Sequence, residues 1–141
     1  MSNFRLYSDG ASRGNPGPSG IGVIIKDKEG NVLKKISQYI GSGTNNVAEY
    51  TALIVGLEEA SRLGIKKLEV LSDSELLVKQ IKGVYKVKSE HLKPLFFLVK
   101  YIANNFSSIV YKHILRDKNT EADKLATEAV KQDLFKSRQV G

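Results

Sequence analysis

Four acidic residues in this chain are spaced so that they could form one metal-binding site. They are Asp9, Glu49, Asp73 and Asp123, and each lies at the end of a predicted strand or the start of a predicted helix. Carboxylate oxygens are the ligands that hard divalent cations such as Mg²⁺ prefer. Two such ions about 3.5–4 Å apart can clamp the attacking and leaving oxygens of a phosphodiester. The four acids therefore favour metal-dependent phosphodiester cleavage.

Each of these acids, taken alone, could instead belong to a helix cap or a tight turn. Their joint placement favours a shared site. Asp9 and Asp73 are expected to end apolar strands, and open α/β sheets bind ligands at strand ends. Three of the four acids are also expected in first turns of helices, where the helix dipole stabilises negative charge. We therefore expect the acids to stay ionised despite their mutual repulsion.

The chain as a whole is basic. Lys and Arg number 22 against 15 Asp and Glu, which gives a net charge of +7 and a pI near 9.5. Such an excess favours a nucleic acid or another polyanion, although a lysine-rich solvated surface gives the same balance. Within the lysine-rich stretch 75–100, Tyr85 is interleaved with Lys86 and Lys88. This combination suits contact with a nucleic-acid backbone together with base stacking.

Composition and length indicate one ordinary globular domain over residues 1–141, with 136–141 expected to be a frayed tail. The chain has no cysteine, which excludes disulfides and thiolate metal sites and suits a reducing cytoplasm. It shows neither a signal peptide nor an apolar run of the roughly 18 residues that a membrane span needs. We expect a cytoplasmic monomer without a membrane partner.

The apolar pattern predicts five strands and four helices. The expected strands cover residues 4–9, 21–27, 32–40, 66–73 and 107–115. The expected helices cover residues 47–63, 74–83, 89–104 and 120–135. Pro94 suits a helix start, which moves the expected start of the third helix towards Leu92. The glycine-rich segment 10–20 is expected to be a loop. The order βββαβααβα predicts an α/β fold with a mixed five-stranded sheet and helices on both faces.

With the four acids placed, the chain resembles ribonuclease H of type 1 from about Phe4 to Val130. The motifs that carry the resemblance, one around each acid, are YSDGASRGNPGPSGIG, TNNVAEYTAL, SDSELLVKQI and NTEADKLA. Four such motifs in this order, with matching spacings, form a strong signal. The resemblance implies a ribonuclease H-like fold and endonucleolytic hydrolysis of the RNA strand of RNA·DNA hybrids. It further implies 5′-phosphate and 3′-hydroxyl products, a role in removing RNA primers and R-loops, and two Mg²⁺ ions that Mn²⁺ can replace.

The resemblance also implies roles for residues of this chain. The metal-ligand positions of the family fall on Asp9, Glu49, Asp73 and Asp123, with Asp9 shared between the two ions. Glu49 would also contact the ribose 2′-hydroxyl next to the cut, which helps to restrict cleavage to RNA. Positions that contact substrate fall on Gly10, Ser12, Asn15, Asn45 and Asn46. Asn15 and Asn46 could instead serve a turn and a helix cap.

Two features depart from many members of that family. The segment before Asp123 is short, and it lacks the mobile-loop histidine, because His113 is expected in a strand. Arg116 is better placed to hold a phosphate near the site, where its permanent charge can position but cannot transfer a proton. The basic protrusion that some members use to grip the hybrid is also missing. Lys86 and Lys88 would supply a reduced version, so we expect weaker binding with a shallower salt dependence.

Other interpretations of the same residues stay open at this level. A domain of this fold could hold nucleic acid without cutting it, or could cut double-stranded RNA as well as hybrids. The acids could also only cap helices in a structural protein. Metal-dependent cleavage, and its loss when Asp9 is changed to Asn, would separate these interpretations.

Overall fold

The computed structural model describes residues 3–140, with side chains as far as Lys131. It contains five strands, four α-helices and one short 3₁₀ helix, η1, in the described part. The strands are β1 Phe4–Ser12, β2 Gly17–Asp27, β3 Val32–Gly43, β4 Lys67–Ser72 and β5 Ser108–His113. The helices are α1 Asn45–Arg62, α2 Glu75–Ile81, α3 Lys93–Ala103, η1 Arg116–Lys118 and α4 Thr120–Val140. The predicted order of strands and α-helices is confirmed.

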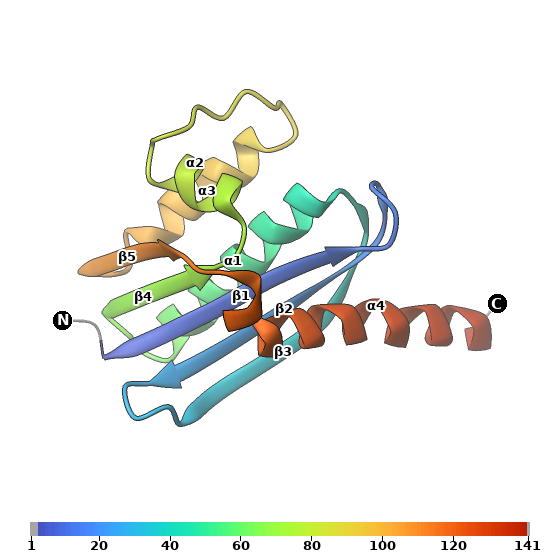
Figure 1. Ribbon diagram of the computed structural model, residues 1–141, viewed down its shortest axis with the longest axis horizontal. Helices are drawn as coiled ribbons and strands as arrows, with labels where there is room; N and C mark the ends of the chain where they lie inside the picture. Colours follow the sequence, from blue (N-terminus) through green and yellow to red (C-terminus); the bar gives the residue numbers. More distant parts are fainter. Residues whose placement is uncertain (1–2, 141) are drawn as a thin grey trace.

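The five strands form one mixed sheet in the order β3-β2-β1-β4-β5 (Figure 1). The first three strands are antiparallel neighbours, whereas β4 pairs in parallel with β1, and β5 in parallel with β4. Helix α4 packs on one face over β1, β2 and β3, and α1 covers the other face, with α3 packed against α1. The predicted fold class is therefore correct. Strand β1 lies at the centre, where the two kinds of pairing meet.

The glycine-rich segment that we expected to be a loop is mostly strand. The β1–β2 ladder continues to the pair Ser12 and Ser19, so the connection between the strands is short. The glycines serve close packing instead. A Cβ on Gly20 would lie 2.7 Å from the carbonyl oxygen of Ala126 on α4, and a Cβ on Gly22 would lie 2.7 Å from the Ala126 nitrogen. Helix α4 can approach the sheet this closely only because β2 has no side chains at these positions.

Helix α1 lies against the sheet through a row of mostly small residues. Thr44 caps the helix, since its hydroxyl accepts a hydrogen bond from the Val47 N–H. The helix therefore starts at Asn45, earlier than the expected start at residue 47, and Asn46 is not its cap. Its buried residues are Ala48, Tyr50, Ala52, Leu53, Gly56, Leu57 and Ala60. The small residues among them, spaced three or four apart, let the helix lie close to the sheet.

A buried hydrogen bond joins α1 to α2 inside the core. The Tyr50 hydroxyl donates to Oε1 of Gln80 at 2.6 Å, and both side chains are at most 5% exposed. We expect Tyr50→Phe to lower the free energy of unfolding by about 1–3 kcal/mol, because it leaves a buried amide oxygen without its donor. Urea denaturation measures the change. Tyr101→Phe, at a side chain that is 73% exposed, is the control, and equal losses in the two variants would contradict the prediction.

The last helix is longer than expected. We expected it to end at Phe135 and the tail 136–141 to fray, but α4 continues to Val140. Neither Gly nor Pro occurs between residues 136 and 140, so the sequence offers no helix breaker there. Gly141 lies outside the described residues. None of the described helices is long and apolar enough to span a membrane.

Candidate active site

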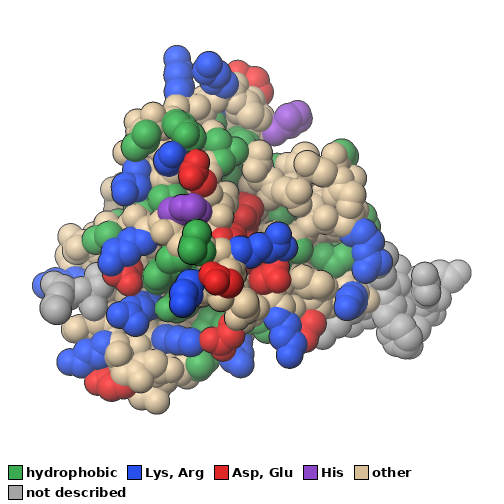
Figure 2. All heavy atoms as spheres, in the orientation of Figure 1, with side chains coloured by type: hydrophobic (Ala, Val, Ile, Leu, Met, Phe, Trp, Pro, Cys, Tyr) green, Lys and Arg blue, Asp and Glu red, His purple; other side chains and the backbone are tan. Residues whose placement is uncertain are grey.

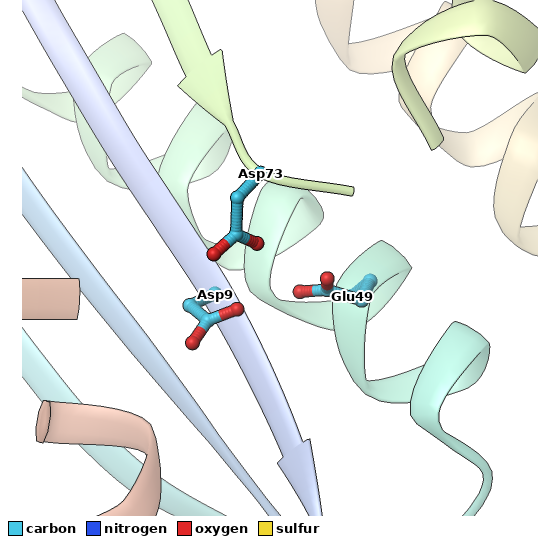
Figure 3. A group of neighbouring side chains, drawn as sticks. All are labelled: Asp9, Glu49 and Asp73. Carbon is cyan, nitrogen blue, oxygen red and sulfur yellow. The ribbon is translucent and has the colours of Figure 1, made fainter. Parts of the chain in front are cut away.

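Three carboxylates meet where β4 ends beside β1. Asp9 comes from β1, Glu49 from α1 and Asp73 from the residue that follows β4, and their side chains point toward one another (Figure 3). One oxygen from each lies within 4.8 Å of the others. Because the donors are all carboxylate oxygens, the set fits a hard divalent cation. Three of the four predicted ligands are thus brought together as a group.

The sheet topology explains why Asp9 and Asp73 lie together. The parallel ladder of β1 and β4 ends with the pair Ser8 and Ser72, so the next residue on each strand is one of the two acids. Asp73 follows the end of its strand, as expected. Asp9 does not end β1, because the strand continues to Ser12 through its pairing with β2. Asp9 is instead 5% exposed, inside a central strand at the point where its parallel neighbour stops.

Glu49 is held against β1 by the backbone of Gly10. The Gly10 N–H donates to Oε1 of Glu49 at 2.5 Å. A Cβ on Gly10 would lie 2.5 Å from the Glu49 nitrogen, so a glycine is needed for α1 to come this close to the strand. Glu49 is the fifth residue of α1 and therefore lies beyond its first turn, contrary to our expectation. Its orientation comes from the strand rather than from the start of its own helix.

Asp123 lies in the first turn of α4 and completes the site from the other face of the sheet. It is outside the group of three but lines the same cavity, whose volume is about 400 Å³. Its Oδ1 is 3.8 Å from Nη2 of Arg116, the first residue of η1. The residues that line this cavity are Asp9, Gly10, Ala11, Ser12, Asn45, Glu49, Asp73, Arg116, Asp123 and Thr127. All five predicted catalytic residues therefore reach one cavity.

Burial and mutual repulsion raise the pKa values of three of the acids, which favours their protonated forms. Burial, followed by the charges of Glu49 and of the other two acids, raises the pKa of Asp9 to about 10. Burial also raises the pKa of Glu49 to about 7, against the hydrogen bond from Gly10, and it raises the pKa of Asp73 against the charge of Arg116. The expectation that helix dipoles keep these acids ionised is wrong. Only Asp123 lies in a first turn, and the trio faces buried surroundings.

These shifts predict how stability depends on pH without metal. Because the pKa values of Asp9 and Glu49 are higher in the folded than in the unfolded protein, the folded protein binds more protons. The stabilisation that these two acids contribute is therefore fully present below about pH 4, where unperturbed carboxyls are protonated. It is lost as the pH rises through about 7 towards 10. In EDTA we expect a steeper fall of the melting temperature with rising pH for wild type than for Asp9→Asn. Parallel curves for the two proteins would contradict this prediction.

The predicted substrate-contact residues divide between two neighbouring cavities. Gly10, Ser12 and Asn45 line the cavity of the acids. Asn15, Asn45 and Asn46 line a second cavity of about 650 Å³, which the segment 89–92 before α3 closes on its far side. Asn45 therefore lies between the two cavities. The Ser12 hydroxyl donates to the Gly43 carbonyl at 2.8 Å, so this side chain also fixes the ends of β1 and β3.

The remaining basic candidates lie on the surface and are not among the residues that line either cavity. Lys86 and Lys88 are exposed in the segment between α2 and α3 and line neither cavity. Figure 2 shows Lys and Arg side chains spread over one face of the molecule, with acidic side chains among them near its centre.

The Asn15 side chain accepts a hydrogen bond from the Asn45 N–H at 3.0 Å, and this contact fixes the β1–β2 connection to the start of α1.

Comparisons with known proteins agree with this geometry. A family model described as "Reverse transcriptase-like" matches residues 7–129. Ribonuclease HI of Halobacterium salinarum is 37% identical over 124 residues, which are 88% of this chain and 62% of that protein. The structure of ribonuclease H1 from the same archaeon superposes with a TM-score of 0.89 and covers 92% of this chain and 98% of that one.

The chain belongs to the ribonuclease H family.

Two further relatives extend this assignment. The structure of LC11-RNase H1 in complex with RNA/DNA hybrid is 47% identical, has a TM-score of 0.89 and covers 93% of this chain and 99% of that one. A bifunctional protein of Mycobacterium tuberculosis is 44% identical over 126 residues, 89% of this chain but 35% of that protein. The chain thus spans about a third of the mycobacterial relative and less than two thirds of the halobacterial one. The ribonuclease H resemblance read from the four motifs is confirmed.

The ribonuclease H site of this chain includes a residue that the sequence analysis did not single out. Asn119, between η1 and α4, is 1% exposed, and its Nδ2 donates to the carbonyl oxygen of Ser8 at 2.9 Å. An asparagine just before a predicted helix indicates a helix cap, and no local pattern indicates that its side chain also contacts β1. His113 is the last residue of β5, is exposed and does not line the cavity.

Proposed function

We propose that this chain is an endoribonuclease that hydrolyses the RNA strand of RNA·DNA hybrids with two Mg²⁺ ions, for which Mn²⁺ can substitute. The observation that supports it most is the meeting of Asp9, Glu49 and Asp73, with Asp123 in the same cavity. Relatives named ribonuclease H and a neighbour solved with RNA/DNA hybrid support the substrate. The proposed products are 5′-phosphate and 3′-hydroxyl ends, as the removal of RNA primers and R-loops requires.

The proposed roles follow from where each acid lies. Asp9, which interacts with each of the other three acids, is placed to serve both metal positions. Asp73 would contribute to one of them, and Asp123, across the cavity, to the other. Bound there, the ions supply Lewis-acid activation of water and charge stabilisation of the leaving oxygen. The protein supplies the fixed geometry, because Asp9 is set by two neighbouring strands and Glu49 by the Gly10 N–H.

Recognition of the hybrid is proposed to use the rim of both cavities. The exposed Asn45 side chain lies between the cavities, so it can reach the RNA strand near Glu49. Gly10, Ser12, Asn15 and Asn46 extend this rim, where backbone and amide groups can contact sugar or phosphate. Lys86 and Lys88 add an exposed positive charge beyond it, and the net charge of +7 supports attraction of the polyanion.

Arg116 is proposed to hold a phosphate beside the acids. Its side chain is 83% exposed, lines the cavity and lies 3.8 Å from Asp123. We expect Arg116→Ala to lower kcat/KM on a hybrid about tenfold, the effect of one hydrogen bond to a charged group. Arg62→Ala, an exposed arginine on α1 that pairs with Glu59, is the matched control. An unchanged kcat/KM for Arg116→Ala would show that Arg116 pairs only with Asp123.

The test of the proposed function compares four labelled substrates. These are an RNA·DNA hybrid, duplex DNA, duplex RNA and single-stranded RNA, each incubated with Mg²⁺ or EDTA. Cleavage of the RNA strand of the hybrid with Mg²⁺ alone is the expected result. Equal cleavage of duplex RNA would favour the broader nuclease, and binding of the hybrid without cleavage would favour a non-cutting module. We also propose that the protein acts in the cytoplasm as a monomeric single domain, and the cysteine-free sequence suits that reducing compartment.

A further inference from the structure

Asn119 lies where the segments that carry Asp9 and Asp123 meet. It ends η1 and directly precedes α4, and its side chain is buried beneath the site rather than exposed in the cavity. Its Nδ2 donates to the carbonyl oxygen of Ser8 at 2.9 Å. Ser8 is the last residue of β1 in the parallel ladder with β4, and Asp9 follows it. One hydrogen bond thus joins the start of α4 to the strand position before Asp9.

The same residue also contacts the segment that carries Asp123. Its backbone oxygen accepts a hydrogen bond from the Asp123 N–H at 3.1 Å, which fixes the first turn of α4. The side chain of Asn119 thus holds β1 beside Asp9, and its backbone holds the first turn that carries Asp123. Asn119 therefore links Asp123 to the backbone at Asp9.

The nitrogen of this amide is the part that makes the side-chain contact. Its Nδ2 donates to Ser8, whereas its Oδ1 is buried and has no hydrogen-bond partner among the described residues. An apolar residue of similar size could not donate to Ser8. The donor therefore gives the reason to have an asparagine at this position.

We propose that Asn119 is a positioning residue that holds Asp123 at the spacing from Asp9 that divalent cations require. This proposal rests on the proposed function, because it assigns Asn119 to the same metal site. The residue itself contacts neither substrate nor ion. Residues that orient metal ligands in this way matter for binding. Their loss typically lowers metal affinity or activity about 10–100-fold.

The decisive measurement is calorimetric titration of the full chain with Mn²⁺ in the absence of nucleic acid. Asn119→Ala is expected to bind Mn²⁺ about 10–100-fold more weakly than wild type. Ser37→Ala is the matched control, because the Ser37 hydroxyl also anchors α4, through the Leu125 carbonyl at 2.7 Å, but away from the acids. It should lose stability without losing Mn²⁺ affinity. If Asn119→Ala binds Mn²⁺ as tightly as wild type, the proposal is overturned.

A second variant covers the case in which Asn119→Ala does not fold. Asn119→Asp keeps the shape of the side chain but cannot donate to Ser8 when ionised. We expect its cleavage rate at saturating Mn²⁺ to fall at least tenfold, with KM for the hybrid unchanged, and a wild-type rate would refute the role of the donor. The titration needs no cleavage. A wild-type protein that binds Mn²⁺ but cuts no hybrid would reject the proposed function, and the affinity comparison would still decide the role of Asn119.

Discussion

Asp9→Asn is expected to abolish cleavage of the hybrid and, in EDTA, to raise the melting temperature. Asp9 is the most buried of the three clustered acids, and one of its oxygens lies within 4.8 Å of an oxygen of each of the other two. Loss of one charge there removes a ligand whose contribution to the transition state is several kcal/mol, which corresponds to a fall in kcat of at least about 10³-fold. The fold of the variant should be unchanged, since the amide is isosteric with the carboxyl.

The gain in stability has the same origin as the loss of activity. Burial and the neighbouring carboxylates raise the pKa of Asp9 to about 10, so near neutral pH the metal-free protein must keep a proton there or tolerate repulsion. Asparagine removes that cost, and we expect a gain on the order of 1–2 kcal/mol, or roughly 5 °C. Differential scanning calorimetry in EDTA measures it.

Asp27→Asn is the matched control for this substitution. Asp27 is an exposed carboxylate at the β2–β3 turn, where it accepts hydrogen bonds from the N–H groups of Glu29 and Asn31. Its replacement should lower stability slightly and leave cleavage intact. An Asp9→Asn protein that still cuts at the wild-type rate would remove Asp9 from the mechanism. An Asp9→Asn protein that is less stable than wild type in EDTA would show that charge repulsion among the clustered acids does not destabilise the metal-free protein.

Gly10→Ala is expected to lose both stability and activity. The added methyl carbon would lie 2.5 Å from the Glu49 nitrogen and 2.7 Å from Cβ of Ala48, well inside contact distance with the helix. Helix α1 must then move away from β1, at a cost on the order of 3 kcal/mol. The movement also lengthens the Gly10 to Glu49 hydrogen bond, and displacement of a catalytic group by about 1 Å can cost about 10²-fold in rate.

Gly64→Ala separates these two effects. Gly64 follows α1 with a φ of 81°, and no atom lies within 4 Å of an added Cβ. Alanine there is strained by about 1–2 kcal/mol but touches nothing in the site. Denaturation and kcat, measured on both variants at a temperature where each is folded, give the comparison. If Gly10→Ala is destabilised but keeps the wild-type kcat, then the close approach of α1 serves packing only.

The sequence predicted the acids better than it predicted the elements that carry them. Motif spacing was sufficient to find Asp9, Glu49 and Asp73, because side chains with this chemistry in this order have few other uses. Strand ends were harder to predict, since Gly10 and Gly20 indicate a loop by composition. In the structure they lie in strands, because α1 and α4 need their small size. That reason exists only in the packed fold.

Asn119 and the raised pKa values show a second limit. The hydrogen bond from Asn119 to Ser8 joins residues 111 positions apart, so no local pattern reports it. The protonation of Asp9 depends on burial and on charges from three other segments. Helix dipoles, weighed against mutual repulsion but without burial, predict the opposite sign. Both features come from long-range contacts, which spacing rules do not describe.

The position of β1 also bears on how the protein is made. Its antiparallel partner β2 follows it directly, whereas its parallel partner β4 comes later, with Phe4 opposite Leu68. Local pairings form at lower entropic cost than distant ones, so a chain leaving the ribosome can close the β1–β2 hairpin first. Asp9 would then lie in an incomplete sheet until β4 and finally α4 have been synthesised. A nascent chain that ends before α4 lacks Asp123, so we expect it not to cleave nucleic acid until the last helix has been added.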